Sequence, residues 1–143
     1  MLSAMDAAQA LADLTEISSQ VEHVAIVDRD GSLLATTVRD APRATRLVAG
    51  ITRLLEEADR VAQARGLPEL TQLEASTLEG SVFAVRRAGR MIAATTRPDP
   101  TVGLVFYDLK HCLGSVEDTS TETTEQGAGK APARRRRKAD TSA

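Results

Sequence analysis

From residue 5 to residue 38 the hydrophobic pattern changes from helical to strand-like. Apolar residues recur at spacings of three and four from Ala7 through Ile17 to Val21, which predicts an amphipathic helix over residues 5–20. The stretch HVAIVDRDGSLLATTV then predicts two short strands around a turn at residues 28–31, where glycine can adopt the positive φ of a hairpin bulge. The first strand is apolar on both faces, so we expect it to be covered on both.

A long helix is predicted next, over residues 41–65. Asp40 is suited to cap this helix, Pro42 fits its first turn, and Gly66 marks its end. Such a helix is about 37 Å long, so it must cross the full width of a domain of this size. Its apolar stripe spans more than about 100° of the circumference, which is broader than a surface helix needs. The stripe comprises Ala44, Leu47, Val48, Ile51, Leu54, Leu55, Ala58, Val61 and Ala62.

Strand-like alternation returns after the long helix and predicts three strands in an antiparallel meander. The stretches are TQLEAST, SVFAVRR and RMIAATT, and each turn between them carries a glycine. The last stretch offers small or apolar side chains to both faces, which is typical of a central strand between helices.

Residues 99–113, DPTVGLVFYDLKHCL, begin like a strand but fit a helix better. A strand period would bring the charged Asp108 and Lys110 onto the face of Phe106, whereas a helical period collects the apolar residues into one stripe. That stripe comprises Val102, Val105, Phe106, Leu109, Cys112, Leu113 and Val116.

The limits of this last helix follow from its flanking residues. Asp99 is suited to cap it, Pro100 to its first turn, and Gly114 to its end. Cys112 lies in the apolar stripe, so we expect a packed thiol rather than a reactive one.

The predicted order is helix, two strands, long helix, three strands, helix. We therefore expect an α/β fold in which a five-stranded antiparallel sheet lies between the long helix and the two terminal helices. This domain would span residues 1–114. Residues 115–143 contain almost no large apolar side chains, which predicts a disordered tail that is acidic and then polybasic.

Composition narrows the possible classes of protein. Apolar residues make up 42%, charged residues 27%, and the net charge is -2, so the chain as a whole shows no commitment to nucleic acid. A single cysteine and the lack of metal-ligand spacing indicate a reducing compartment. No apolar run approaches the roughly 18 residues of a membrane-spanning helix, and no leader-like segment is recognisable. We therefore expect a cytoplasmic protein.

Candidate catalytic chemistry is sparse. GAGK at 127–130 lacks the first glycine and the final Ser or Thr of a phosphate-binding loop. His23 and His111 lie far apart in the sequence, with no paired carboxylates or nucleophile recognisable near either. We therefore expect no catalysis by this chain alone, no cofactor and no metal.

Two arginine clusters are candidate binding sites. Arg46, Arg53 and Arg60 form a ridge on the polar face of the long helix, which is either a solvated face with an ion pair from Glu56 to Arg60 or a partner-binding site. The tail cluster is suited to phosphates of nucleic acid or to an anionic membrane surface, at about 1 kcal/mol per residue near a membrane. A merely solvated tail is an equal alternative. This cluster comprises Arg134, Arg135, Arg136, Arg137 and Lys138.

Two stretches carry a resemblance to a known family. HVAIVDRDGSLLATT is similar to the first hairpin, with its Asp-Gly turn, of the roadblock family, which includes a dynein light chain and bacterial regulators of Ras-like GTPases, and TVGLVFYDLKHCL is similar to the start of its last helix. The resemblance covers residues 7–114. It implies a profilin-like α/β sandwich that dimerises through its long helix and the following edge strand. Such a domain binds small GTPases or acts as a scaffold beside them, and has no catalytic residue of its own. The arginine-rich tail has no counterpart in the family pattern.

A homodimer is also expected on physical grounds. The strand within LTQLEAS would leave a row of backbone groups unpaired at a sheet edge. A single charged residue, Glu74, would do little to prevent this edge from pairing with another strand. Gly50, in mid-helix, either allows close packing of another backbone or is simply tolerated. The predicted interface comprises Leu47, Gly50, Ile51, Leu54 and Leu73.

The sequence leaves three candidate functions for this protein: a GTPase regulator or scaffold, a ligand-sensing module, or a nucleic-acid or membrane adaptor that acts through the tail.

Overall fold

The structure is a computed structural model that describes the backbone of residues 2–128 and the side chains of residues 6–116. Its elements follow the predicted order, which is confirmed. They are α1 (Leu2–Ile17), β1 (Val21–Val27), β2 (Leu33–Thr36), α2 (Ala41–Ala64), β3 (Gln72–Thr77), β4 (Gly80–Arg87), β5 (Arg90–Thr96) and α3 (Val102–Ala128).

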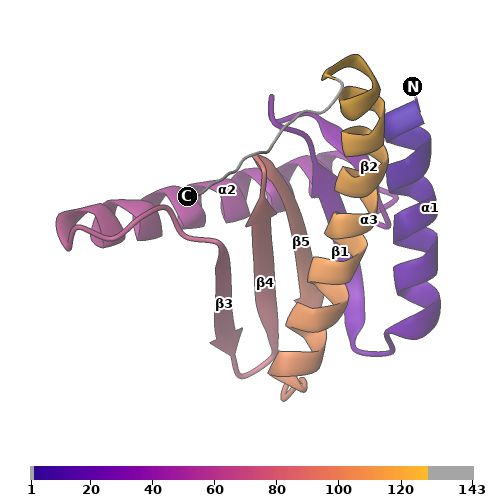
Figure 1. Cartoon of the computed structure of the whole chain (residues 1–143). Helices are drawn as coiled ribbons and strands as arrows, with labels where there is room; N and C mark the ends of the chain where they lie inside the picture. Colours follow the sequence, from indigo (N-terminus) through magenta and orange to yellow (C-terminus); the bar gives the residue numbers. More distant parts are fainter. Residues whose placement is uncertain (1, 129–143) are drawn as a thin grey trace, which may run out of the picture.

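The strands form one antiparallel sheet in the order β2-β1-β5-β4-β3 (Figure 1). The β1–β2 hairpin and the β3–β4–β5 meander join where β1 pairs with β5, with Ile26 opposite Ile92 and Ala25 opposite Ala93. The short β2 and the strand β3 are therefore the edges, and the strands that are apolar on both faces lie in the middle.

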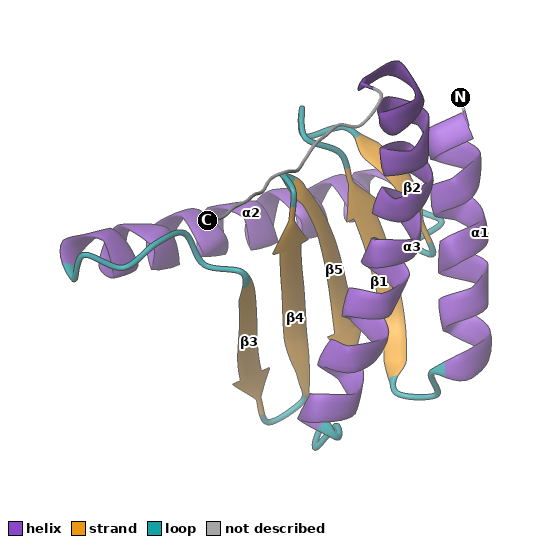
Figure 2. Ribbon diagram, viewed as in Figure 1, coloured by secondary structure: helices purple, strands orange, loops and turns teal. Residues whose placement is uncertain are grey.

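Helices cover both faces of the sheet, as predicted. α1 and α3 lie side by side over one face, where Ile26, Phe83 and Ile92 are fully buried (Figure 2). α2 crosses the other face, where Ala84 and Ala93 are fully buried. Neighbouring residues of β4 and β5 thus contribute to opposite cores, which explains why both faces of these strands are apolar.

The first helix is shorter at its C-terminus than predicted. α1 ends at Ile17, and Val21 begins β1 instead of closing the helical stripe. Val21 packs from the strand against the core beneath α1 and α3. A β-branched valine fits a pleated strand better than a helix end, which accounts for the difference.

The prediction that Gly114 ends the last helix is wrong. α3 continues through Gly114 to Ala128, so the backbone of residues 115–128 is helical. A Cβ at Gly114 would lie 3.1 Å from a guanidinium nitrogen of Arg87. Glycine here makes room for a strand side chain, so its role is packing rather than helix termination. A domain boundary at residue 114 stays a prediction, and residues 129–143, including the polybasic cluster, lie outside the described residues.

The start of α3 also differs from the prediction. The helix begins at Val102, so Asp99 and Pro100 precede its first turn. Asp99 has φ +58°, a left-handed conformation that is unlike that of an N-cap. The backbone carbonyl of Thr101 instead accepts the first helical hydrogen bond, at 3.0 Å from the nitrogen of Val105.

Candidate interaction surface

The apolar stripe of α2 is only half covered by the sheet. Ala44, Ile51, Leu55 and Ala62 are buried against it, as a helix period of 3.6 requires of one face. The remaining large residues of the predicted stripe are less covered, and Leu54 is 40% exposed and Val61 68% exposed. α2 therefore presents an apolar flank, consisting of Leu47, Gly50, Leu54 and Val61, that the described part of the chain leaves partly or largely uncovered.

This flank continues toward the β3 edge of the sheet. β3 pairs with β4 on one side and is the terminal strand of the sheet on the other. Figure 2 shows that the C-terminal part of α2 extends beyond β3 before the chain turns back into that strand. A projecting helix and an unpaired strand edge together make a surface suited to a second polypeptide.

An ion-pair clamp holds the projecting part of α2 to the sheet. Asp59 Oδ1 accepts hydrogen bonds from Arg86 Nη2 at 2.8 Å and from the backbone nitrogen of Leu70 at 3.0 Å. Arg86 also donates to the Leu70 carbonyl from Nε and Nη2, at 3.1 and 2.7 Å. Its Nη1 lies 3.3 Å from Glu69 Oε2. One guanidinium thus joins α2, the α2–β3 connection and β4.

The clamp changes the titration of Asp59. Hydrogen bonding to Arg86, followed by the Leu70 N–H bond, holds the pKa of this carboxyl below its usual value. The sequence analysis missed the clamp. A signal was present, because Arg86 shares a strand face with the fully buried Ala84, and an arginine on such a face requires a partner.

A second arginine, at the start of β5, holds the turn between β1 and β2 in place. Arg90 is 3% exposed, and its Nε donates to Asp28 Oδ1 at 3.1 Å. The same Asp28 oxygen accepts from the backbone nitrogen of Arg29 at 2.8 Å. This backbone bond, with the bond from Arg90, lowers the pKa of Asp28. Gly31 completes the turn with φ +89°, which confirms the expected positive φ.

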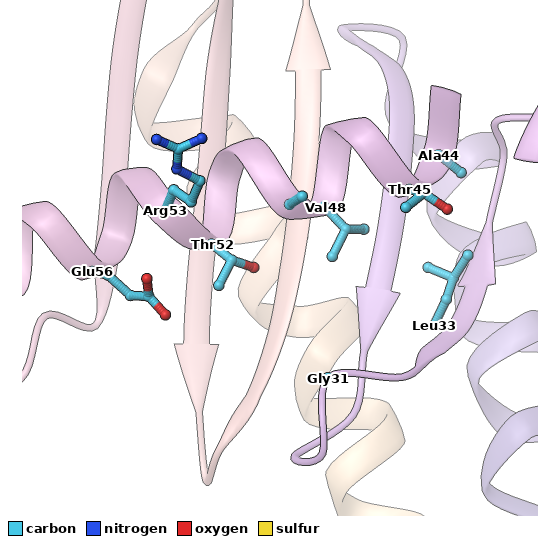
Figure 3. A pocket seen from close by; sticks show the side chains of 9 residues that line it. Gly31, Leu33, Ala44, Thr45, Val48, Thr52, Arg53 and Glu56 are labelled. Atoms are coloured by element: carbon cyan, nitrogen blue, oxygen red, sulfur yellow. The ribbon is translucent and has the colours of Figure 1, made fainter. Parts of the chain in front are cut away.

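This turn and the N-terminal half of α2 enclose a groove of about 530 Å³ that the sequence analysis did not predict. Figure 3 shows Val48 and Thr52 on the side of α2 that faces the turn, with Leu33 beside them. The groove is mainly apolar, with Arg53 and Glu56 as its charged residues. Its lining comprises Gly31, Leu33, Ala44, Thr45, Val48, Ala49, Thr52, Arg53 and Glu56.

The predicted arginine ridge is exposed along α2, at Arg46, Arg53 and Arg60. Arg60 pairs with Glu57 in the preceding turn of the helix. The expected pair with Glu56 is therefore wrong, and Glu56 instead lines the groove together with Arg53. Of the three ridge residues, Arg53 thus lies beside the groove, Arg60 has a local ion pair, and Arg46 is exposed on the same helix.

The five predicted interface residues do not share one environment. Ile51 is 4% exposed because it packs against the sheet, and Leu47 and Leu73 are half-buried beside the same core. Gly50 and Leu54 are exposed. A Cβ at Gly50 would meet nothing within 4 Å, so packing inside this chain does not require glycine there.

The other candidate residues lie apart from this surface. Cys112 is buried and its thiol donates to the Ala10 carbonyl at 3.4 Å; burial, with a smaller contribution from the charge of Asp13, raises its pKa to about 12. A packed thiol was predicted. His111 stacks on Tyr107 on α3, and His23 lies in β1.

Among residues 6–116, no three His, Cys, Asp or Glu side chains are grouped so that they could hold a metal ion. Within the described part of the chain, no helix has the length and apolar character needed to cross a membrane.

Comparisons with known proteins agree with this architecture. The Roadblock/LC7 domain family matches residues 7–97. A Roadblock/LC7 domain from Streptomyces avermitilis is similar in structure, with a TM-score of 0.71 and 13% identity over 79% of this chain and 96% of that one. MglB, a gliding protein from Thermus thermophilus, gives a TM-score of 0.70 and 12% identity over 84% and 92% of the two chains. Myxococcus xanthus MglB gives 0.65 and 14% over 84% and 88%.

A comparison of the sequence with curated proteins gave no match. The family match covers more than half of the chain, and its span includes the hairpin stretch that carries the resemblance, whereas the second stretch, at residues 101–113, lies beyond it. The chain therefore belongs to the Roadblock/LC7 domain family.

Proposed function

We propose that this protein is a homodimeric, non-catalytic regulator or scaffold that binds a small Ras-like GTPase. The observation that carries the proposal is the uncovered apolar flank of α2 beside the unpaired edge of β3, in a chain of the Roadblock/LC7 family. Large exposed apolar residues that continue into an open strand edge are typical of an interface between polypeptides.

A second copy of the chain satisfies both features at once. Two antiparallel β3 edges would pair their free backbone groups, and the two projecting α2 helices would cover each other's Leu54 and Val61. Gly50 would let the helix backbones approach closely, which offsets its cost in a helix interior. One solved structure with this fold is described as MglB with a tetrameric arrangement, which is in keeping with self-association.

Light scattering on the full chain tests this dimer. We expect the mass of two chains at micromolar concentration. Leu54→Glu should shift the protein to one chain, because it places a charge in the apolar flank. Leu104→Glu is the matched control, since Leu104 is 49% exposed on α3, away from α2. A monomeric wild-type protein, or equal effects of both substitutions, would contradict the interface.

The partner-binding site is proposed along α2, at Arg53 and the groove beside it, with Arg46 and Arg60 in the same ridge. This surface combines an apolar wall with exposed cations, and none of the residues that line the groove belongs to the apolar flank that the dimer would use. Regulation would then consist of positioning the switch segments of the GTPase, since the resemblance supplies no catalytic residue.

A binding assay with native small GTPases loaded with GTP or GDP tests this part. We expect nucleotide-dependent binding to the dimer, weakened by Arg53→Glu. Arg97→Glu is the control, because it reverses an exposed charge on the β5–α3 connection. Binding that both variants weaken equally would indicate general charge attraction, and binding that neither weakens would remove the ridge from the site. The chain alone should not hydrolyse GTP.

The groove supports a second candidate function, a ligand-sensing module. Its volume of about 530 Å³ lies within the 300–1,000 Å³ typical of small-molecule sites, and Thr45, Thr52 and Arg53 supply polar groups. A ligand there should raise the melting temperature of the wild-type protein and not that of Val48→Trp, which fills the groove. If no metabolite mixture from the native cell changes the wild-type melting temperature, this candidate fails.

The third candidate, an adaptor for nucleic acid or for the inner surface of the membrane, rests on the polybasic cluster at residues 134–138. A cytoplasmic protein with this cluster could attach peripherally to anionic lipid. Sedimentation with vesicles containing phosphatidylserine tests it, and binding should disappear when the four arginines are replaced by glutamine.

A further inference from the structure

The most exposed large apolar side chain among residues 6–116 lies at the end of the edge strand β3. Leu78 is 97% exposed, in the two-residue turn that joins β3 to β4. Tight turns of this kind favour glycine, asparagine and aspartate, so the turn itself does not require a leucine. The exposed side chain is therefore available for contact with another molecule.

The β3–β4 turn is fixed by residues other than Leu78. Thr77 Oγ1 donates to the Gly80 carbonyl at 2.8 Å and accepts from the backbone nitrogen of Glu79 at 3.1 Å. A Cβ at Gly80 would clash with the carbonyl oxygen of Thr96, so glycine lets the turn pack against the end of β5. These contacts hold the backbone of the turn in place and leave the side chain of Leu78 in solvent.

A second exposed leucine lies before the other end of β3. Leu67 is 58% exposed, in the connection between α2 and β3. Its backbone nitrogen donates to the Ala62 carbonyl at 2.9 Å, and Gly66 has φ +74°, which together form the Schellman motif that ends a helix. The backbone of Leu67 is thus also held in place while its side chain stays largely uncovered.

The two leucines have neighbours of opposite charge. Glu79 follows Leu78, Arg65 precedes Leu67 by two residues, and both charged residues are exposed. Neither takes part in the ion pairs found among residues 6–116. One end of β3 therefore presents a leucine with a carboxylate, and the other end presents a leucine with a guanidinium.

An antiparallel second copy of β3 would bring these two ends together. The backbone nitrogen of Arg86 donates to the Thr71 carbonyl at 2.8 Å, so odd-numbered residues of β3 direct their backbone groups to β4 and even-numbered residues direct theirs to the open edge. A two-fold axis at Glu74 then places residue 78 of one copy opposite residue 70 of the other. An axis one residue earlier or later places it opposite residue 68 or 72.

The projecting end of α2 lies at the same level. Figure 2 shows that β3 runs away from the α2–β3 connection, so an antiparallel partner strand would run toward this connection and end beside it. The turn that follows the partner strand would then meet the connection that contains Leu67.

We propose that the β3–β4 turn of each copy docks on the α2–β3 connection of the other, with Leu78 against Leu67 and Glu79 paired with Arg65. This inference rests on the proposed homodimer and assigns contacts at both ends of its paired strands. A second copy is the occupant that the charges favour, because one chain carries both the carboxylate end and the guanidinium end. Two-fold symmetry makes the same contact twice, so each substitution removes two contacts.

Sedimentation velocity on the full-length protein tests the leucine contact. Leu78→Gln should raise the Kd of the dimer at least about tenfold, because burial of two leucine side chains is lost. Ile17→Gln is the matched control, since Ile17 is 65% exposed at the end of α1, on the other side of the sheet from α2. It should change Kd by less than about twofold. Equal changes of Kd for the two variants would overturn the contact.

A charge exchange tests the ion pair. Glu79→Arg and Arg65→Glu should each raise Kd about two- to fivefold, as expected for an exposed pair. A protein that carries both substitutions should return to a Kd close to that of the wild type, because each charge again meets its opposite on the partner. Local damage to either turn would instead persist in this protein. Additive weakening by the two substitutions would overturn the pairing.

Cross-linking identifies the contact directly. β3 rises about 20 Å along its six residues, so a short bifunctional maleimide cannot join residues 67 and 78 of one chain. The native Cys112 is buried. A protein with both Leu67→Cys and Leu78→Cys should form a covalent dimer, and neither single variant should.

The outcomes also separate this contact from the dimer itself. A wild-type protein that sediments as a monomer would overturn both the homodimer and the contact. A wild-type dimer whose double-cysteine variant does not cross-link would overturn the contact alone.

Discussion

The two faces of the sheet are built from equally apolar strands but are completed differently. On the face beneath α1 and α3, two helices enclose a core in which Leu109, Val105 and Phe83 are fully buried. On the opposite face a single helix covers a smaller core, and Leu54 and Val61 of the same stripe remain exposed. One helix cannot cover the width that two helices cover. The described part of the chain thus covers the first face and leaves the second partly open, and this open part is where we propose that a second copy packs.

The largest effect is expected on the face of the sheet that α1 and α3 cover. Leu109→Ala removes a side chain that is fully buried between α3 and the sheet, and it should lower the free energy of unfolding by about 2–5 kcal/mol. Urea denaturation measures the change. A loss below about 1 kcal/mol would mean that this core relaxes around the cavity and is less tightly packed than its burial indicates.

A leucine-to-alanine substitution on the face covered by α2 allows the two faces of the sheet to be compared directly. Leu54→Ala should change the unfolding free energy of the monomer by less than about 1 kcal/mol, because Leu54 is already 40% exposed. It should weaken the dimer by about 2 kcal/mol, close to a thirtyfold rise in Kd, if Leu54 is a central contact. Dilution experiments by sedimentation velocity measure Kd. Equal losses of monomer stability for Leu54→Ala and Leu109→Ala would remove the distinction between the faces.

The ion-pair clamp gives a prediction of intermediate size on the open face. Asp59→Asn should lower the unfolding free energy by about 1–2 kcal/mol at neutral pH, because Arg86 and the Leu70 N–H lose a charged acceptor. The folded pKa of Asp59 lies below its unfolded value, so its contribution is complete above the unfolded value and disappears as the pH falls through the folded one.

The difference between the wild-type protein and Asp59→Asn should therefore shrink below about pH 4. Thermal unfolding of both proteins between neutral pH and pH 3 follows this convergence. Asp30→Asn is a useful comparison, since the pKa of Asp30 is also lowered, by hydrogen bonds from Ser32, but this carboxylate does not join two elements. A difference that persists unchanged at pH 3 would assign the effect to packing rather than to charge.

The smallest effect is expected at Gly50. Gly50→Ala should stabilise the monomer by about 0.4–1 kcal/mol, because a Cβ meets no atom of the same chain and alanine restricts the unfolded chain. The same change should raise the Kd of the dimer if the partner's helix packs against this position. Denaturation at low protein concentration and sedimentation at several concentrations separate the two effects. Stabilisation without weaker dimerisation would place Gly50 outside the interface.

Patterns in the sequence predict features that depend on neighbouring residues and miss those that depend on contacts between distant residues. The helical stripe of α2 and the alternation in β4 and β5 predict their elements correctly, because 3.6 and 2.0 are local periods of the backbone. Gly114 misled the prediction, since nothing near it in the sequence shows that Arg87 packs against it. The same limit applies to Asp99, whose left-handed φ is set by the connection in which it lies.

The candidate surfaces depend still more on contacts between distant residues. Arg86 meets Asp59 and Leu70 across β4, α2 and the connection between them, and the groove beside α2 exists because a turn held by Arg90 faces that helix. Asp108 reads in the sequence as an ordinary polar residue on α3. Its burial beside α1 follows only from the packing of the two terminal helices.

The sequence by itself determined the order of the elements, the layers of the sandwich and the strands that lie at its centre, because periodicity and turn chemistry act between near neighbours in the chain. The tertiary structure alone decided which part of the α2 stripe stays exposed and which arginines become clamps. These properties depend on how much of each side chain its neighbours cover, and residues far apart in the sequence set that coverage.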